Sequence, residues 1–93
     1  MKPTSRVTQM AVSLKHIKIQ YFALLREQRG CSEEKVDTQA STPHELYEEL
    51  TDKHRFSLPV NRLTVAINDD FAQWDQLLKN DDVVVFIPPV AGG

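Results

Sequence analysis

Residues 83–93 read Val-Val-Val-Phe-Ile-Pro-Pro-Val-Ala-Gly-Gly, and they carry the strongest structural signals in the chain. The first five residues are all apolar, which predicts a strand that is buried on both faces and lies inside a sheet. Pro88 and Pro89 cannot donate hydrogen bonds to a neighbouring strand, so the strand should end there and the chain should continue in extended polyproline geometry. Gly92 and Gly93 lack side chains and allow close backbone approach. We therefore expect a thin, extended arm that carries the carboxylate of Gly93 away from the domain.

The rest of the sequence contains three further strand patterns and one shorter one. In residues 16–21, apolar and polar side chains alternate, which is typical of a strand with one buried face. Residues 33–39 alternate more weakly around a single valine, so we expect an edge strand that pairs antiparallel with the first. Residues 63–67 alternate again, and the turn signal Asn68-Asp69-Asp70 separates them from a short strand at residues 71–72.

Two helices are predicted between these strands. A short helix should cover residues 23–29, with Gly30 at the C-terminal position that needs a positive φ. A longer helix should begin after Thr42. The sequence Thr42-Pro43-His44-Glu45 places a hydroxyl at the N-cap, proline in the first turn and glutamate at the third helical position, which is a capping box. This helix should run to His54 or Arg55.

The order of elements is strand, short helix, strand, helix, strand, short strand, strand. If the first and last strands lie side by side and parallel at the centre, the weak strand falls at an edge and the long helix crosses one face. This arrangement is an α+β fold, the β-grasp or ubiquitin-like roll, with a mixed sheet. The alternative is a ferredoxin-like split βαβ fold, which requires two full helices on one face. Because only one full helix is evident, we predict the β-grasp roll.

Length and composition restrict the class of protein. The chain has 93 residues and a net charge of −2, which predicts one globular domain with no general attraction to nucleic acid. Cys31 is the only cysteine, and one cysteine with three histidines cannot supply the ligand spacing of a structural metal site. No apolar stretch is long enough to cross a bilayer, so we expect a cytoplasmic protein with no membrane partner. Residues 1–14 should form a disordered N-terminal extension, and residues 15–93 should form the domain with its tail.

Several segments resemble the small, sulfur-carrier subunit family of molybdopterin synthase. They are Ile17-Lys18-Ile19, Tyr21-Phe22-Ala23, Arg26-Glu27, Ala66-Ile67-Asn68 and Phe86-Ile87-Pro88-Pro89-Val90-Ala91-Gly92-Gly93. The resemblance covers residues 16–93. Its most specific part is the eight-residue ending, because other β-grasp proteins that end in Gly-Gly generally lack the paired prolines.

The resemblance implies a function in sulfur transfer. In this family the terminal carboxylate, here that of Gly93, is adenylated by a ubiquitin-activating-type enzyme that uses ATP. Sulfur from a persulfide donor then displaces AMP, and the resulting thiocarboxylate donates sulfur to cyclic pyranopterin monophosphate in molybdenum cofactor biosynthesis. The implied docking partner is the large catalytic subunit of molybdopterin synthase, which supplies the acid–base groups. The chain would thus be a non-catalytic sulfur-donor subunit of a heterotetramer and would bind no cofactor itself.

The resemblance also assigns roles to individual residues. Gly93 is the residue that is modified. The tail that delivers it comprises Pro88, Pro89, Val90, Ala91 and Gly92. Phe22, Phe71 and Ile87 fall where the family presents an apolar patch to its partners, and Arg26 falls where a charged contact is expected. Each apolar side chain could instead belong to the core, where aromatic residues on strands are most often found.

Two positions depart from the family pattern. Ile87 is aliphatic where an aromatic residue is commoner, and Asp81 stands in a turn that often carries glycine, although aspartate tolerates a left-handed backbone better than most residues. The remaining candidates for chemistry are weaker. We expect Asp81 and Asp82 to be solvated rather than catalytic, Trp74 to pack at the edge of the core, and Cys31 to be an inert thiol.

Three functional classes remain open from the sequence. The first is the sulfur carrier of molybdopterin synthase, which the Pro-Pro-Val-Ala-Gly-Gly ending favours. The second is a sulfur carrier for another pathway, such as thiamine synthesis or tRNA thiolation, where the same tail chemistry serves another acceptor. The third is a ubiquitin-like protein modifier, in which Gly93 would form an isopeptide bond with a lysine.

Overall fold

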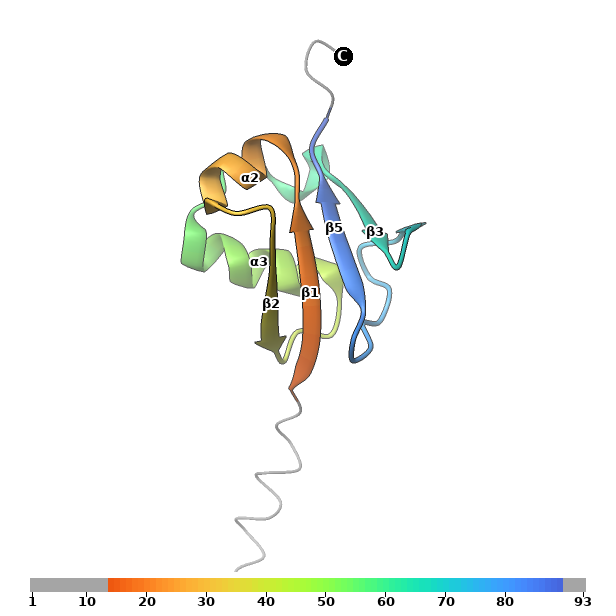
Figure 1. Ribbon diagram of the computed structural model, residues 1–93. Coiled ribbons are helices and arrows are strands. Elements are labelled where there is room, and N and C mark those ends of the chain that lie inside the picture. The colour runs from red at the N-terminus through yellow and green to blue at the C-terminus, as the bar shows by residue number, and fades with distance from the viewer. Residues whose placement is uncertain (1–13, 90–93) are drawn as a thin grey trace, which may run out of the picture.

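The computed structural model describes residues 14–89 as a five-stranded mixed sheet with one long helix packed behind it (Figure 1). The strands are β1 (Lys15–Tyr21), β2 (Glu33–Thr38), β3 (Thr64–Ile67), β4 (Asp70–Ala72) and β5 (Val83–Ile87). The helical elements are α2 (Ala23–Arg29), α3 (Pro43–His54) and the single 3-10 turn η1 (Val60–Arg62). The predicted N-terminal extension lies outside the described residues except for Leu14, which is exposed.

The sheet order is β2-β1-β5-β3-β4, and β5 lies at its centre. β5 runs parallel to β1, whereas the pairs β1–β2, β3–β5 and β3–β4 are antiparallel. The central position of β5 follows from its composition, because a strand that is apolar on both faces buries most surface when it is flanked on both sides. β2 is polar and lies at an edge. The predicted β-grasp roll, with its parallel central pair and polar edge strand, is confirmed.

The two α-helices begin and end where local sequence signals predict. Thr42 caps α3 by accepting a hydrogen bond from the backbone N–H of Glu45 at 3.2 Å. The Glu45 carboxylate accepts a bond from the backbone N–H of Ser41 at 2.7 Å, one residue earlier than in a reciprocal capping box. Gly30 ends α2 with a φ of 87°, and its N–H donates to a carbonyl of the last helical turn. The predicted helix boundaries are therefore confirmed.

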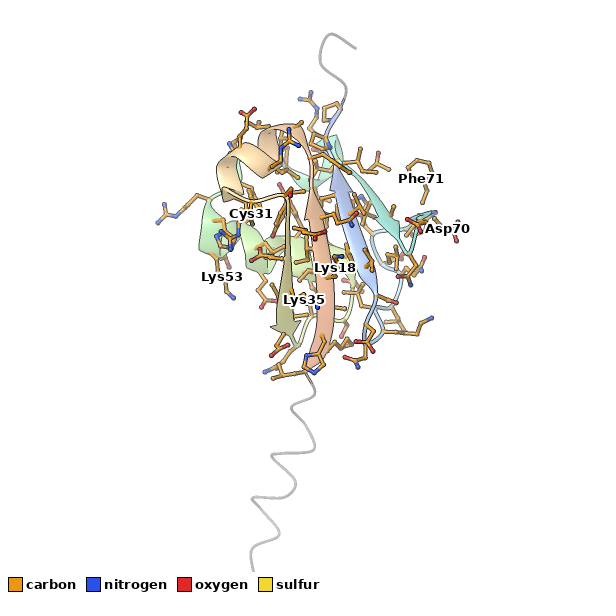
Figure 2. The ribbon with its side chains drawn as sticks, in the orientation of Figure 1. Lys18, Cys31, Lys35, Lys53, Asp70 and Phe71 are labelled. Carbon is orange, nitrogen blue, oxygen red and sulfur yellow. The ribbon has the colours of Figure 1, made fainter. Side chains whose placement is uncertain are left out.

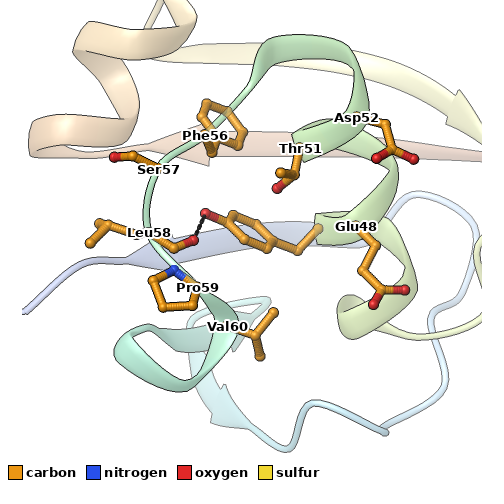
Figure 3. Close-up of a pocket in the computed structure, with 9 residues that line it drawn as sticks. Glu48, Thr51, Asp52, Phe56, Ser57, Leu58, Pro59 and Val60 are labelled. Carbon is orange, nitrogen blue, oxygen red and sulfur yellow. Dashed lines mark hydrogen bonds between the residues drawn. The ribbon is translucent and has the colours of Figure 1, made fainter.

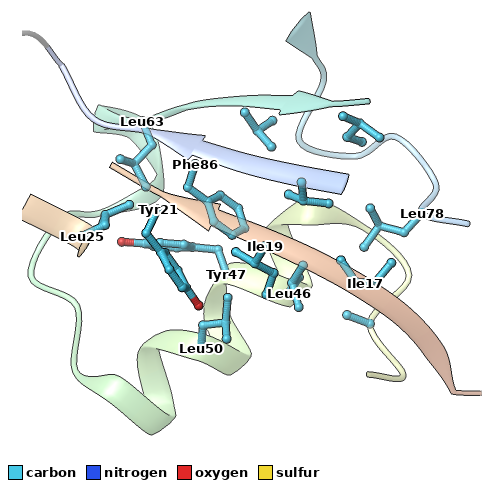
Figure 4. Packing of buried hydrophobic residues seen from close by; sticks show 14 of the residues in the cluster. Ile17, Ile19, Tyr21, Leu25, Leu46, Tyr47, Leu50, Leu63, Leu78 and Phe86 are labelled. Carbon is cyan, nitrogen blue, oxygen red and sulfur yellow. The ribbon is translucent and has the colours of Figure 1, made fainter. Parts of the chain in front are cut away.

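The core lies between α3 and the sheet (Figure 4). Tyr21 and Phe86 from the central strands are fully buried, and the ring of Tyr47 from α3 lies 5.1 Å from that of Phe86. Trp74 stacks on Phe86 at a centroid distance of 5.9 Å, so its predicted place at the edge of the core is confirmed. Burial of one such aromatic side chain contributes about 2 kcal/mol. Aliphatic side chains form most of the rest of the core: Ile17, Ile19, Leu25, Leu46, Leu50, Leu63, Val65, Ile67, Leu78 and Val84.

The two acidic residues before β5 have different environments. Asp81 is exposed and has a φ of 72°, so aspartate does occupy a left-handed turn there. The prediction that Asp82 is solvated is wrong, because this residue is only 4% exposed. Its carboxylate accepts hydrogen bonds from the Asn68 side-chain amide at 2.9 Å and from the Lys79 backbone N–H at 2.7 Å. Since Asn68 also accepts a bond from the Val83 backbone N–H, the pair joins the β3–β4 turn to the start of β5.

Candidate functional site at the end of the central strand

β1 and β5 end side by side, because they are parallel and Tyr21 is in register with Phe86 (Figure 1). The residues that follow the two strands therefore lie at the same end of the sheet. Phe22 follows β1, and Pro88 follows β5. β5 ends at Ile87, directly before Pro88, as the two prolines predict. Pro88 is half-buried and Pro89 is exposed. The other tail residues, Val90, Ala91, Gly92 and Gly93, lie outside the described residues.

Phe22 lies at the junction of β1 and α2, with its side chain directed to solvent. It is 46% exposed, whereas the preceding residue, Tyr21, is fully buried, as alternation along a strand requires. The next residue, Ala23, has a φ of 52°, which turns the chain from β1 into α2. Arg26 is also exposed, and its backbone N–H donates to the Phe22 carbonyl at 3.4 Å. The structure therefore brings Phe22 and Arg26 together beside the end of β5.

Ile87 and Phe71 lie on the face of the sheet opposite α3, which we call the open face. In the strand pairing, Ile87 lies opposite Thr64 and Phe71 lies opposite Ala66. Both pairs alternate with the core residues along their strands, so their side chains lie on the other face of the sheet. Phe71 is 79% exposed and stands at the edge of the sheet, on β4 (Figure 2). Ile87 is half-buried at the tail end. Phe22 and Ile87 thus share one end of the sheet, whereas Phe71 lies on the far side of β3.

Three further apolar residues of β5 and α2 were not singled out from the sequence. Val83 and Val85 alternate with core residues along β5, so their side chains belong to the open face. The signal was present, because a strand that is apolar on both faces needs cover on both, and α3 covers only one of them in the described part of the chain. Leu24 of α2 is exposed, while its neighbour Leu25 is buried. A helix of seven residues is too short for its pattern to distinguish the two.

The titratable groups with shifted pKa values lie in the packing between β1, α2, β2 and α3. Hydrogen bonds from the Arg29 guanidinium hold the pKa of Glu34 below its ordinary value, against the opposing effect of burial. Burial, together with a hydrogen bond to Glu34, raises the pKa of Tyr21. Burial also lowers the pKa of His54. These groups are packing residues, and their contacts join elements rather than face the end of β5.

Residues 14–89 contain neither a cluster of metal ligands nor a membrane-spanning helix. The described residues contain no cluster of three or more His, Cys, Asp or Glu side chains that could hold a metal ion. Over the same range, no helix is long and apolar enough to cross a membrane.

A hollow of about 520 Å³ lies between α3 and the loop that follows it (Figure 3). The Tyr47 hydroxyl donates to the Leu58 carbonyl at 2.7 Å within this hollow. Thr51 Oγ1, which also lines it, is buried and has no hydrogen-bond partner among the described residues. The hollow lies on the α3 side of the sheet, away from the open face, and none of the residues with predicted roles lines it.

The sheet order, the single long helix across one face and the central strand that leads into paired prolines define a ubiquitin-like β-grasp protein. A family model described as the ThiS family matches residues 19–93, so the match includes the whole of β5 and the tail. The chain belongs to the ThiS family.

Individual proteins similar to this chain include sulfur carriers. The molybdopterin synthase sulfur carrier subunit of Haemophilus influenzae is 31% identical over 80 residues, which cover 83% of this chain and 99% of that protein. A structure assigned as molybdopterin converting factor subunit 1 of Pyrococcus furiosus is 29% identical, with a TM-score of 0.69 and coverage of 82% of this chain and 99% of its own. A complex of subunits 1 and 2 of the molybdopterin-converting factor from Helicobacter pylori contains a chain that is 25% identical, with a TM-score of 0.57 and coverage of 84% and 99%.

Proposed function

We propose that this chain is the sulfur carrier subunit of a molybdopterin synthase. The observation that carries the proposal is the end of β5, where a strand held between β1 and β3 leads through Pro88 and Pro89 toward Gly92 and Gly93. A strand with neighbours on both sides is a rigid base for the residues that follow it. The match to sulfur carriers over nearly their whole length supports the same conclusion.

The proposed chemistry converts the Gly93 carboxylate into a sulfur nucleophile. A carboxylate is a poor acyl donor, because its leaving group would be oxide. An adenylating partner enzyme transfers AMP from ATP to the carboxylate, with release of pyrophosphate, and so forms an acyl-adenylate. The terminal sulfur of a persulfide donor then displaces AMP, and cleavage of the S–S bond by a thiol leaves the thiocarboxylate. ATP is thus used by the partner and not bound by this chain. A cytoplasmic location supplies both ATP and the reducing conditions in which a thiol persists.

The arm delivers the sulfur to a substrate that the partner holds. The large catalytic subunit binds cyclic pyranopterin monophosphate and supplies the acid–base groups, and two sulfur deliveries build the dithiolene of molybdopterin. Docking replaces a chance encounter with a positioned one, and this proximity contributes several kcal/mol to the reduction of the barrier. The carrier itself needs only its activated terminus and a surface for docking.

The docking surface proposed for this chain surrounds the end of β5. Phe22 and Ile87 lie at the base of the arm, with Arg26 on α2 and Phe71 on β4 to either side. Interfaces are enriched in aromatic residues and arginine, and a few such side chains carry most of the binding energy. The complex of two subunits known for the Helicobacter pylori molybdopterin-converting factor supports a large-subunit partner. We propose a heterotetramer with one carrier at each end of a large-subunit dimer.

Intact-mass spectrometry tests the proposal directly. The carrier is incubated with the adenylating enzyme, ATP and a persulfide donor, and then with the large subunit and pyranopterin substrate. We expect a mass increase that corresponds to exchange of one oxygen for sulfur, followed by its loss as molybdopterin forms. The control omits ATP and should leave the mass unchanged.

The same experiment separates the other two functional classes. A carrier that gains sulfur but never converts the pyranopterin serves another acceptor, such as one in thiamine synthesis or tRNA thiolation. A chain that gains no sulfur but forms adducts with lysine side chains is a protein modifier. Either result would contradict the proposed function.

A further inference from the structure

Two residues at opposite ends of α2 bind the same carboxylate. Tyr21 precedes the turn into α2, and its hydroxyl donates to Glu34 Oε2 at 2.5 Å. Arg29 is the last residue of α2, and its Nε and Nη2 donate to Glu34 Oε2 and Oε1 at 2.9 and 2.7 Å. Because Glu34 lies on β2, one side chain on a neighbouring strand closes the connection from residue 21 to residue 29. We call these three residues the Glu34 network.

The helix inside this network is weak by itself. α2 has seven residues, whereas isolated helices shorter than about 12 residues are marginal in water. Leu25 is its buried residue, and Phe22 at the N-cap makes no side-chain cap. Ala23 begins the helix with a φ of 52°, which costs a residue with a side chain about 1 kcal/mol. Tertiary contacts must therefore hold α2 in place.

The Glu34 network is well suited to that role because it is shielded from water. The side chains of Arg29 and Glu34 are 28% and 17% exposed, and the guanidinium binds the carboxylate in bidentate geometry, which is strong and directional. Glu33, the neighbour of Glu34 on β2, has a side chain that is 52% exposed, and its Oε1 lies 3.4 Å from Lys18 Nζ. Such exposed pairs contribute little to stability. Glu33 therefore provides a matched control for Glu34.

A second contact holds the same turn of α2. The Gln28 side-chain amide donates to Ser57 Oγ at 2.8 Å and accepts from the Ser57 backbone N–H at 3.1 Å. This contact ties α2 to the loop after α3, while the Glu34 network ties it to β1 and β2. Phe22 and Arg26 lie between the tied ends, so their orientation depends on these contacts.

We propose that Glu34 is a positioning residue for docking to the large subunit. It acts through Tyr21 and Arg29, not on the reacting sulfur, and it holds α2 so that Phe22 and Arg26 form a preformed surface. A preformed surface binds more tightly than one that must be ordered on binding, because ordering costs free energy. The inference rests on the proposed function, since it requires the large subunit as partner.

The first test measures α2 in the isolated full-length carrier. Amide hydrogen exchange is compared for the wild type, Glu34→Gln and Glu33→Gln, at a temperature where circular dichroism shows all three to be folded. The N–H groups of Leu25 and Gly30 are bonded within this segment and report on it. We expect Glu34→Gln to speed their exchange about tenfold more than it speeds the exchange of the amides of β1 and β5, which report on global unfolding. Glu33→Gln should leave every rate unchanged.

The second test measures docking. The same proteins are titrated by calorimetry against the large subunit of molybdopterin synthase from the same organism. Glu34→Gln should raise Kd about tenfold, whereas Glu33→Gln should match the wild type. In sulfur transfer, Glu34→Gln should raise KM for the carrier and leave kcat unchanged, because only docking is affected. Because a smaller folded fraction of the carrier would also raise the apparent KM, the assay is run at the temperature where circular dichroism shows all three proteins to be folded.

A double-mutant cycle distinguishes loss of the contact between Glu34 and Arg29 from nonspecific destabilisation. Arg29→Met removes the bidentate contact from the other side, so its effect on Kd should not add to that of Glu34→Gln. Additive effects of the two substitutions on Kd would show that Glu34 and Arg29 act independently. Unchanged amide exchange at Leu25 and Gly30 in Glu34→Gln would show that the Glu34 network does not hold α2. Either result would overturn the proposal. Faster exchange with an unchanged Kd would overturn the positioning role. Failure of the wild type to bind the large subunit would instead overturn the proposed function, and the exchange data would be unaffected.

Discussion

Five non-glycine residues within residues 14–89 adopt a positive φ, and each stands at a turn or at a helix end. They are Ala23 (52°), Arg55 (60°), Asn68 (53°), Asp69 (75°) and Asp81 (72°). Three of the five are Asn or Asp, the residue types that enter the left-handed region most readily after glycine. The two consecutive positive φ angles between β3 and β4 are typical of the tight turns that join antiparallel strands. At the residue scale, the turns are therefore formed by side chains that tolerate this backbone.

Substitution of Asp81 tests the left-handed turn before β5. Asp81→Gly should leave the free energy of unfolding unchanged or slightly higher, because glycine removes about 1 kcal/mol of steric cost and loses a similar amount through a freer unfolded chain. Asp81→Val should lower it by about 2 kcal/mol, since a β-branched residue fits this backbone poorly. Urea denaturation of the three proteins measures both effects. A valine variant as stable as the wild type would contradict the turn geometry.

Asp82 offers a second prediction at the residue scale. Asp82→Ala should lower the free energy of unfolding by about 2 kcal/mol, because it leaves the Asn68 amide and the Lys79 N–H without their buried acceptor. The exposed residue Asp75 provides the control, and Asp75→Ala should change stability by less than about 0.5 kcal/mol. Thermal unfolding followed by circular dichroism compares the two variants. Equal effects would show that the burial of Asp82 has no energetic consequence.

The two α-helices differ in what stabilises them. α3 carries its own start signal, since the Thr42 hydroxyl and the Glu45 carboxylate satisfy backbone N–H groups at its N-terminus. α2 has no side-chain cap, and a carboxylate on β2 holds its last turn. At the scale of elements, α3 is thus specified by neighbouring residues and α2 by contacts with other elements.

The Glu34 network predicts a pH dependence of stability. The pKa of Glu34 is lowered from its ordinary value of 4.5, chiefly by hydrogen bonds from Arg29, while Tyr21 and His54 also face the carboxylate. Because the pKa of Glu34 is lower in the folded state, its ionised carboxylate contributes fully to the free energy of unfolding above pH 4.5. This contribution is lost as pH falls through the folded-state pKa. At neutral pH, the free energy of unfolding of the wild type should exceed that of Glu34→Gln by about 2 kcal/mol, and this difference should shrink in acid. Urea denaturation across this range measures it, and a constant difference would contradict the role of the charge.

At the scale of the whole molecule, the sheet has two unlike faces. α3 covers one face, and the open face carries apolar side chains of β5 with lysines of β1 and β2 beside them (Figures 1 and 2). An apolar strip with a polar border is typical of an interaction surface. β5 contributes to the core, to the open face and to the base of the tail. Docking and delivery therefore depend on the same strand.

Deletion of Gly93 separates the body from the proposed chemistry. The variant should unfold at the same urea concentration as the wild type, because the core is formed by residues within the described domain. It should show no exchange of oxygen for sulfur by intact mass and should yield no molybdopterin. The deletion variant ends in the carboxylate of Gly92, one residue short, so Gly93→Ala, which keeps the length of the tail, serves as the comparison. Undiminished sulfur transfer by the deletion variant would contradict the function proposed for this residue.

Much of the fold could be predicted from local patterns. The apolar run of β5 implied a central strand, and the weak alternation of residues 33–39 implied an edge strand. Gly30 and the capping box at Thr42 marked helix ends correctly. These signals succeed because backbone sterics, capping and strand alternation involve residues only a few positions apart. The exposure of Phe22 also followed from its phase relative to Tyr21.

Other features depended on residues that are distant in sequence. The burial of Asp82 requires Asn68, 14 residues away, and its local Asn-Asp-Asp sequence is typical of a solvated turn. Glu34 joins Tyr21 and Arg29, but alternation along β2 gives no sign of that contact. The amino-acid sequence alone predicted the central and edge strands, the helix ends and the composition of the tail. The packed structure determined which polar side chains are buried and which elements they join, because a buried polar group needs a partner that only folding brings within hydrogen-bond distance.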